Sequence, residues 1–159
     1  MNYWLFKSEP DAFSIDDLAA APKQTSAWDG VRNFQARNML RDSIEKGDEA
    51  FFYHSSCAVP GIAGIVSIAK AGYPDVTAFD AKHHHHDPDS DPKSPRWYVV
   101  DVKLVRRLPR VITLGELREH AKKELSGMAL LRAGNRLSVM PVTPEHWKFI
   151  TSLASRITK

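Results

Sequence analysis

The chain has 159 residues, of which 43% are hydrophobic and 26% are charged, a composition typical of one globular domain with its own core. The longest apolar run, residues 62–68, is far shorter than the roughly 20 residues that span a membrane, and the first residues do not resemble a signal peptide. A single cysteine, Cys57, excludes an internal disulfide and fits a reducing, cytoplasmic compartment, while the net charge of +3 is compatible with a polyanionic partner.

The N-terminal third of the chain predicts one strand and two helices. Aromatic residues indicate the strand, over residues 2–6. Ser14, with an acid three residues later, forms a capping box that predicts a short helix, and a loop over residues 23–32 follows. Asn33 is the expected N-cap of a longer helix over about residues 34–46, because apolar residues recur there at helical spacing.

The remaining elements do not follow the regular alternation of a doubly wound sheet. Strands are expected over residues 50–54, 61–68, 96–104 and 136–142, and helices from Thr113 to about Lys123 and from Pro144 onward. A proline-rich stretch, about residues 80–95, is expected to be a flexible insertion loop. This order predicts one domain over residues 1–159, in the α+β class, whose mixed sheet curls into a partial barrel with short helices around it.

The run from Trp28 to Asn38 is the most informative stretch of the sequence. It combines an aromatic ring, a glycine at position 30 and several Arg, Asn and Gln side chains, directly before a predicted helix. An aromatic face stacks on a flat ring, and Arg, Asn and Gln read the hydrogen-bonding edge of that ring. The run therefore indicates a site for a planar ligand, with a nucleobase as the first candidate. A buried tryptophan beside a capped helix is the alternative, and the sequence leaves both open.

Four consecutive histidines, residues 83–86, lie among aspartates in the insertion loop. Neighbouring side chains of an extended loop point in alternating directions, so four in a row are not expected to build one tetrahedral metal site. We expect adventitious metal affinity there, but no structural or catalytic metal. The Rossmann and P-loop fingerprints are absent from the sequence, and no cofactor is expected.

No spacing in the sequence indicates a Ser-His-Asp triad. Ser55 follows His54 directly, and adjacent residues of a strand point to opposite faces, so a hydrogen bond between the His54 ring and the backbone is the expected role. An enzyme acting on RNA or a nucleotide would need His54, Glu9 or Cys57 as base or nucleophile. A non-catalytic binding module is the favoured interpretation.

Several separated strings of the sequence resemble one family. They are residues 3–10, 28–33, 52–55, 61–64 and 136–139, in this order, with Trp97 and Trp147 matching as well. On these strings the chain resembles EVE-domain proteins over nearly its whole length. The resemblance implies a PUA-like pseudo-barrel. It also implies a module without catalytic activity that binds a modified base, a 5-substituted cytosine above all, in DNA or RNA.

The resemblance also implies where the base-binding pocket lies. Its members would be Lys7, Ser8, Glu9, Trp28, Gly30, Val31, Arg32, Asn33, Tyr53, His54, Ser55, Leu137 and Ser138. Trp28 and Tyr53 would supply aromatic faces, and stacking is worth about 1–3 kcal/mol per base. Phosphates would be held by Arg32, Arg37 and Arg136, together with a helix N-terminus. Substitution of Trp28 by alanine is expected to remove base binding and to leave the fold largely intact.

The implied partner is a nucleic acid that carries a modified base. The protein is expected to act as a monomer in the cytoplasm, with access to the nucleoid in a bacterium, or in the nucleus in a eukaryote. The four histidines stand where the family often has basic and aromatic residues, so the resemblance does not extend to a nucleic-acid contact from this loop. A sensor of a free nucleoside or other small molecule, and an RNA-processing or nucleotide-modifying enzyme, are the alternatives.

Overall fold

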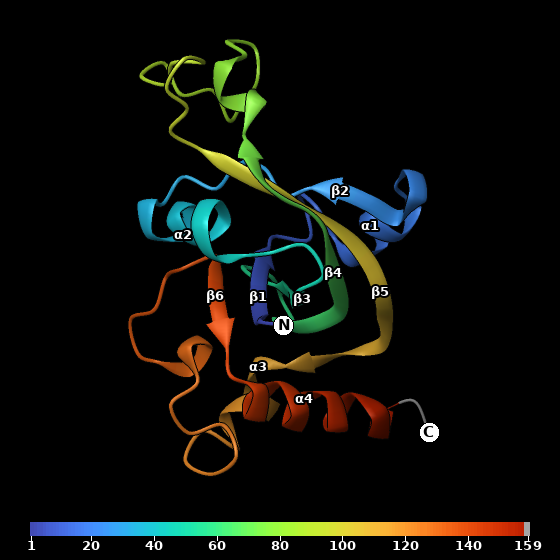
Figure 1. Ribbon diagram of the computed structural model, residues 1–159. Coiled ribbons are helices and arrows are strands. Elements are labelled where there is room, and N and C mark those ends of the chain that lie inside the picture. Colours follow the sequence, from blue (N-terminus) through green and yellow to red (C-terminus); the bar gives the residue numbers. More distant parts are fainter. Residues whose placement is uncertain (158–159) are drawn as a thin grey trace.

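The computed structural model describes residues 1–157, which form one mixed sheet with short helices packed around it (Figure 1). The strands are β1 (Tyr3–Ser8), β2 (Thr25–Ala27), β3 (Glu49–His54), β4 (Gly61–Pro74), β5 (Tyr98–Thr113) and β6 (Val139–Val142). They lie in the order β2-β5-β4-β3-β1-β6, with β1 and β3 parallel and the other neighbours antiparallel. The predicted α+β class is confirmed.

Two long strands, β4 and β5, give the sheet its curl. Their pairing contains several register shifts, and such bulges bend strands and increase their twist. Figure 1 shows both ribbons bending as they cross the molecule. Each strand is longer than the sequence predicted. The added residues are largely polar or exposed, so they do not show the hydrophobic pattern of a strand. Pairing from Gly61 with Thr113 to Pro74 with Tyr98 keeps those ends in the sheet.

The helices are α1 (Ile15–Ala20), α2 (Phe34–Asn38), α3 (Leu114–Arg118) and α4 (Pro144–Ile157). Both predicted capping boxes form, because the hydroxyls of Ser14 and Thr113 accept the amide N–H three residues later and the acid there accepts the amide of the cap. Asn33 caps α2 as predicted, and its side-chain oxygen accepts the N–H of Ala36. No helix among residues 1–157 is long and apolar enough to cross a bilayer.

Several boundaries differ from the sequence prediction. The segment expected to be a loop over residues 23–32 contains β2, which pairs with β5. The helix expected over residues 34–46 is α-helical only to Asn38, and a π-helical turn, Met39–Ser43, follows it. Gly72 of β4 lies against that turn, where a Cβ would come within 2.4 Å of the Leu40 carbonyl oxygen. This close approach of strand and turn requires glycine.

The sheet separates two hydrophobic cores, and the residues of β1 and β3 alternate between them. Phe6 and Phe52 belong to the first core, against α1 and α2. Leu5, Phe51 and Tyr53 belong to the second core, against α3 and α4, and α4 runs beneath the sheet in Figure 1. This period of two follows from the strand pleat. It decides which side chains can meet at the functional site.

Candidate functional site

A cavity of about 580 Å³ opens beside the end of β1, and its volume falls in the range typical of ligand-binding pockets. The lining residues are Lys7, Ser8, Glu9, Ala12, Phe13, Ser26, Ala27, Trp28, Asp29, Gly30, Val31, Arg32, His83, His84, His85 and Ser138. Three segments far apart in the sequence therefore meet here: the turn after β1, the loop before α2 and the histidine run of the insertion loop. Most residues of the predicted pocket belong to this lining.

Hydrogen bonds at the end of β1 assemble the first wall of the cavity. The Ser8 hydroxyl donates to the Phe13 carbonyl at 2.6 Å, which folds the turn back on the strand. The backbone N–H of Lys7 donates to the Ser138 carbonyl at 2.8 Å, so Ser138 joins the site. Burial lowers the pKa of Lys7 below its usual value.

The second wall, residues 28–32, is fixed by the buried carboxylate of Asp75. One oxygen of Asp75 accepts the N–H of Gly30 at 2.9 Å and lies 3.0 Å from Nη1 of Arg32, while the other accepts the N–H of Thr77 at 2.9 Å. Burial alone would raise the pKa of Asp75, but hydrogen bonds from Thr77, Gly30 and Arg32 outweigh burial and hold the pKa below its usual value. The loop therefore rests on a charged anchor.

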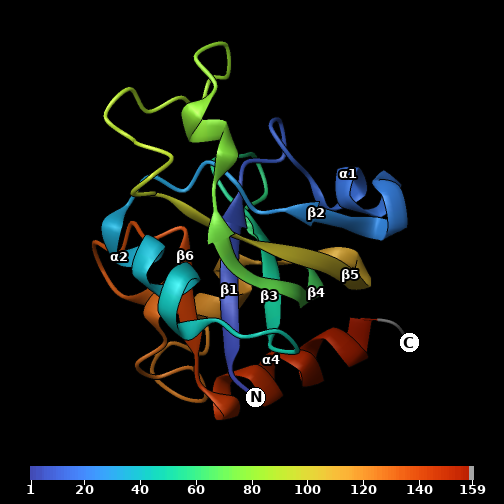
Figure 2. The same ribbon diagram turned by 45° about the horizontal axis from the view of Figure 1, so that its top comes forward.

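The third wall comes from the insertion loop, which projects beyond the ends of β4 and β5 (Figure 2). Nη2 of Arg32 donates to the His85 carbonyl at 2.6 Å. The His85 ring lies directly on Gly30, where an added Cβ would come within 2.5 Å of the ring. Asp87 anchors the loop a second time, because it accepts the Nε1–H of Trp97 at 2.5 Å. Part of the loop that was expected to be a flexible insertion is thus a wall of the cavity.

Trp28 is a buried tryptophan beside a capped helix, as one interpretation of its motif predicts, and it also borders the cavity. Its side chain lines the cavity, yet the residue is only 7% exposed and belongs to the first core. The ring centre lies 5.3 Å from that of Phe6 and 5.2 Å from that of Phe52, and Phe13 packs edge-on at 6.4 Å. The expectation that alanine at position 28 leaves the fold intact therefore conflicts with the structure.

The predicted residues of β3 and its following loop are not among the lining residues. Tyr53 is 3% exposed and lies in the second core, on the face of the sheet opposite to Trp28. Nε2 of His54 accepts the N–H of Ile15 at 3.1 Å, which is the expected kind of hydrogen bond to the backbone, and burial lowers the pKa of His54. Ser55 donates its backbone N–H to the Ser8 carbonyl at 2.9 Å and so supports the wall from behind.

Three other predicted residues, Asn33, Arg136 and Leu137, line a separate groove of about 490 Å³. Arg37, expected to hold a phosphate, donates to the Arg96 carbonyl at 2.7 Å. Of the three arginines assigned to phosphate, Arg32 lines the cavity, and Arg136 and Arg37 are not among its lining residues.

Sequence reasoning missed Asp29, Asp75, Phe13 and the three histidines as parts of the site. Asp29 lies inside the recognised run from Trp28 to Asn38, and Phe13 adjoins the capping box at Ser14, so both were close to residues that were recognised. No local pattern points to Asp75 or His85, because their partners lie 43 to 53 residues away in the chain.

Comparison with known proteins identifies the family of this chain. The EVE domain family matches residues 2–153. Thymocyte nuclear protein 1 of Homo sapiens is 46% identical over 169 aligned residues, which cover 98% of this chain and 75% of that protein. A crystal structure of the human THYN1 protein in complex with DNA containing 5-methylcytosine has a TM-score of 0.92 at 46% identity, and the match covers 97% of this chain and 98% of that one.

A bacterial structure is similar to the same extent. The X-ray structure of a Pseudomonas putida protein has a TM-score of 0.90 at 52% identity, and the match covers 96% of this chain and 99% of that one. The resemblance noted in the sequence is confirmed, and this chain belongs to the EVE domain family.

Proposed function

We propose that this protein is a non-catalytic nucleic-acid-binding module that takes one modified base, with 5-methylcytosine as the first candidate, into the cavity beside β1. The observation that carries the proposal is the cavity itself, in which an aromatic wall and polar groups converge. The family supports it, because a solved relative, the human THYN1 protein, is in complex with DNA containing 5-methylcytosine. Its place of action is then any compartment that holds nucleic acid.

The chemistry of the walls suits a pyrimidine. Trp28 and Phe13 offer apolar contact to a ring and its methyl group, and Ser8 and Ser138 offer polar groups to its edge. Extruding a base from a stack costs a few kcal/mol, which these contacts have to offset. An apolar pocket distinguishes one methyl group by only about 1–3 kcal/mol, so we expect modest selectivity for the modified base.

The arrangement of candidate catalytic groups supports a binding role. Glu9 lines the cavity. His54 is engaged with the backbone of Ile15, and neither His54 nor Cys57 is among the lining residues of the described chain. An enzyme that used Glu9, His54 and Cys57 together would need a base and a nucleophile within hydrogen-bond reach of one substrate atom, and only Glu9 of the three lines the cavity.

One observation favours a second candidate, a sensor of a free nucleoside. The carboxylates of Glu9 and Asp29 line the same cavity and offset the charges of Lys7 and Arg32, so the lining offers no excess positive charge to a phosphate. Salt separates the candidates, because binding to a nucleic acid weakens steeply as salt rises and binding of a neutral nucleoside does not.

The test is a fluorescence anisotropy titration with DNA and RNA oligonucleotides that carry cytosine, 5-methylcytosine or 5-hydroxymethylcytosine, at two salt concentrations. Ala12→Trp should block the cavity, because Ala12 is exposed and lines it. Ala133→Trp is the matched control, because Ala133 is exposed in the separate groove. We expect salt-sensitive binding that favours the modified base and is lost in the first variant alone. Loss in the Ala133 variant alone would move the site to the groove.

A further inference from the structure

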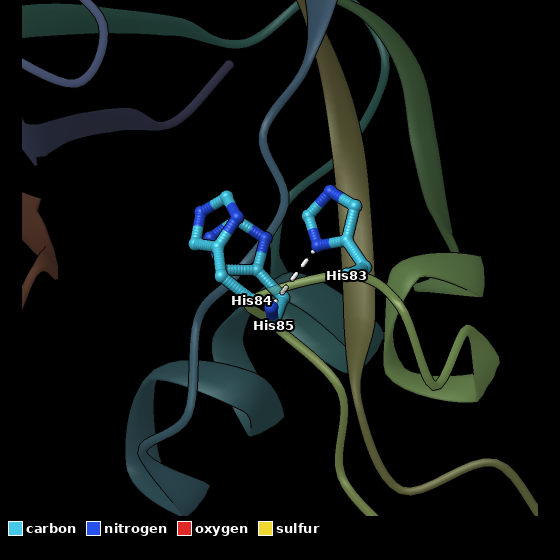
Figure 3. Close-up of side chains that lie close together, drawn as sticks. All are labelled: His83, His84 and His85. Atoms are coloured by element: carbon cyan, nitrogen blue, oxygen red, sulfur yellow. Dashed lines mark hydrogen bonds between the residues drawn. The ribbon is translucent and has the colours of Figure 1, made fainter.

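Three consecutive histidines of the insertion loop gather at one wall of the cavity (Figure 3). The loop turns here, because His86 donates its N–H to the His83 carbonyl at 2.9 Å. The ring centres of His83 and His84 are 4.6 Å apart, and those of His84 and His85 are 3.9 Å apart. The extended loop assumed from the sequence, with side chains alternating in direction, is therefore not what forms.

We propose that His83, His84 and His85, together with Asp29, form a binding site for one divalent transition-metal ion, with zinc as the first candidate. One ring nitrogen from each histidine lies within 4.8 Å of the others. Imidazole nitrogen suits zinc, copper and nickel, and a carboxylate oxygen completes a common set of zinc ligands. The inference is independent of the proposed function, because it rests on the donor atoms alone.

The pairing of His85 with Asp29 is the strongest part of the argument. Nδ1 of His85 is buried and has no hydrogen-bond partner among the described residues, which is costly for a polar atom. It lies 3.7 Å from Oδ1 of Asp29, close to the separation of about 3.3 Å between two donors on a tetrahedral zinc ion with bonds near 2.0–2.1 Å. A metal ion between these two atoms would satisfy the buried nitrogen.

The remaining donors have to move to form a tetrahedral site, because Asp29 is outside the set of donors within 4.8 Å of one another and the other two histidines are too widely spaced. The 4.8 Å spread has to contract by about 1.5 Å to reach tetrahedral spacing. His84 is exposed, so its side chain has room to move. Nδ1 of His83 accepts the N–H of His85 at 3.0 Å, and metal binding requires either that this hydrogen bond is given up or that the ring turns to offer its other nitrogen.

A metal ion here would join two parts of the site that are distant in sequence. Asp29 belongs to the loop before α2, and the histidines belong to the insertion loop. The two loops are already joined by the hydrogen bond from Arg32 to the His85 carbonyl. The ion would add a second link beside the first. We therefore expect metal binding to order the cavity wall and to raise thermal stability, because the ion binds the folded arrangement.

The test is calorimetric titration of the full chain with zinc chloride, after treatment with a chelator. We expect one equivalent to bind, and His83→Ala, His84→Ala, His85→Ala and Asp29→Asn each to weaken binding by roughly tenfold or more. His86→Ala is the matched control and should bind as the native chain does, because His86 is exposed and outside the cluster. Circular dichroism and melting without metal show whether each variant folds.

Two results would overturn the inference. If the histidines bound metal as an affinity tag does, His86→Ala would lose as much affinity as the other histidine variants. Asp29→Asn would then have no effect on affinity, because Asp29 lies more than fifty residues from the histidines in the sequence. Absence of binding to the folded native chain would overturn it as well. Thermal melting gives an independent readout, since zinc should raise the melting temperature of the native chain and of His86→Ala by similar amounts and that of Asp29→Asn by less.

Discussion

Nη1 of Arg32 lies 3.0 Å from Oδ2 of Asp75, and that same oxygen accepts the N–H of Gly30 at 2.9 Å. The Asp75 side chain is 1% exposed, so the carboxylate of this pair is shielded from water. The pair fixes the segment that forms one wall of the cavity, and through Arg32 it also holds the His85 carbonyl of another wall. One buried carboxylate thus organises two of the three walls.

Asp75→Asn should destabilise the protein by about 2–4 kcal/mol, because it leaves the Arg32 guanidinium without its countercharge and sets an amide donor against donors. Asp42→Asn is the control, since Asp42 forms an exposed pair with Arg41 and should change stability much less than Asp75→Asn does. Urea denaturation measures both. Equal effects would mean that Asp75 does not anchor residues 28–32.

Gly30→Ala should disturb the cavity beyond the cost of backbone strain. Gly30 and Gly47 both adopt positive φ angles, +78° and +94°, where alanine is strained by about 1–2 kcal/mol. Only at Gly30 does the added Cβ meet the His85 ring, while at Gly47 it meets nothing within 4 Å. We expect Gly30→Ala to reduce affinity for a modified base in anisotropy titrations, and Gly47→Ala to keep it. Equal affinities of the two variants would mean that the contact between position 30 and the His85 ring does not affect binding.

Trp28→Ala should cost about 3–5 kcal/mol of stability, because the ring is buried against Phe6 and Phe52. It is therefore a poor variant for measuring binding alone. Tyr53→Phe makes the informative comparison, since Tyr53 lies on the opposite face of the sheet and should retain native affinity for the base. A large loss of affinity in Tyr53→Phe would contradict the location of the site.

The local parts of the fold were predictable from the sequence, and the long-range parts were not. Capping boxes at Ser14 and Thr113 act within four residues, so their sequence pattern suffices. The pocket segments at residues 7–9 and 28–32 were expected from the resemblance to the EVE family, and both line the cavity. The partners of Asp75 depend on how distant loops dock, which no local pattern records.

The placement of Tyr53 shows a signal that was present but unused. Side chains alternate along a strand, so Tyr53 must face away from its neighbours Phe52 and His54. Phe52 packs against Trp28 in the first core. Tyr53 therefore lies on the other face of β3 from Phe52 and Trp28 and cannot share a pocket with Trp28. Period-two alternation over residues 52–54 therefore excludes Tyr53 from the pocket.

Glu116 should make stability depend on pH in the acid range. Its hydrogen bonds from Arg110, at 2.6 and 3.1 Å, and from Thr113 lower its pKa from 4.5 to about 2. Because the folded pKa is depressed, the stabilisation is present above pH 4.5 and is lost as the pH falls from 4.5 towards 2. The melting temperature of Glu116→Gln should be lower than native at pH 6, and the difference should shrink at pH 3. A constant difference would contradict the assignment.

Photo-crosslinking tests the location of the base most directly. A duplex with a single 5-iodocytosine places a reactive atom where a 5-methyl group would lie, and mass spectrometry identifies the residue that it joins. The account predicts crosslinks to the apolar wall, at Trp28 or Phe13, and competition by an unlabelled duplex with 5-methylcytosine. Crosslinks confined to the groove that Arg136 and Leu137 line would contradict the account and place the base outside the cavity.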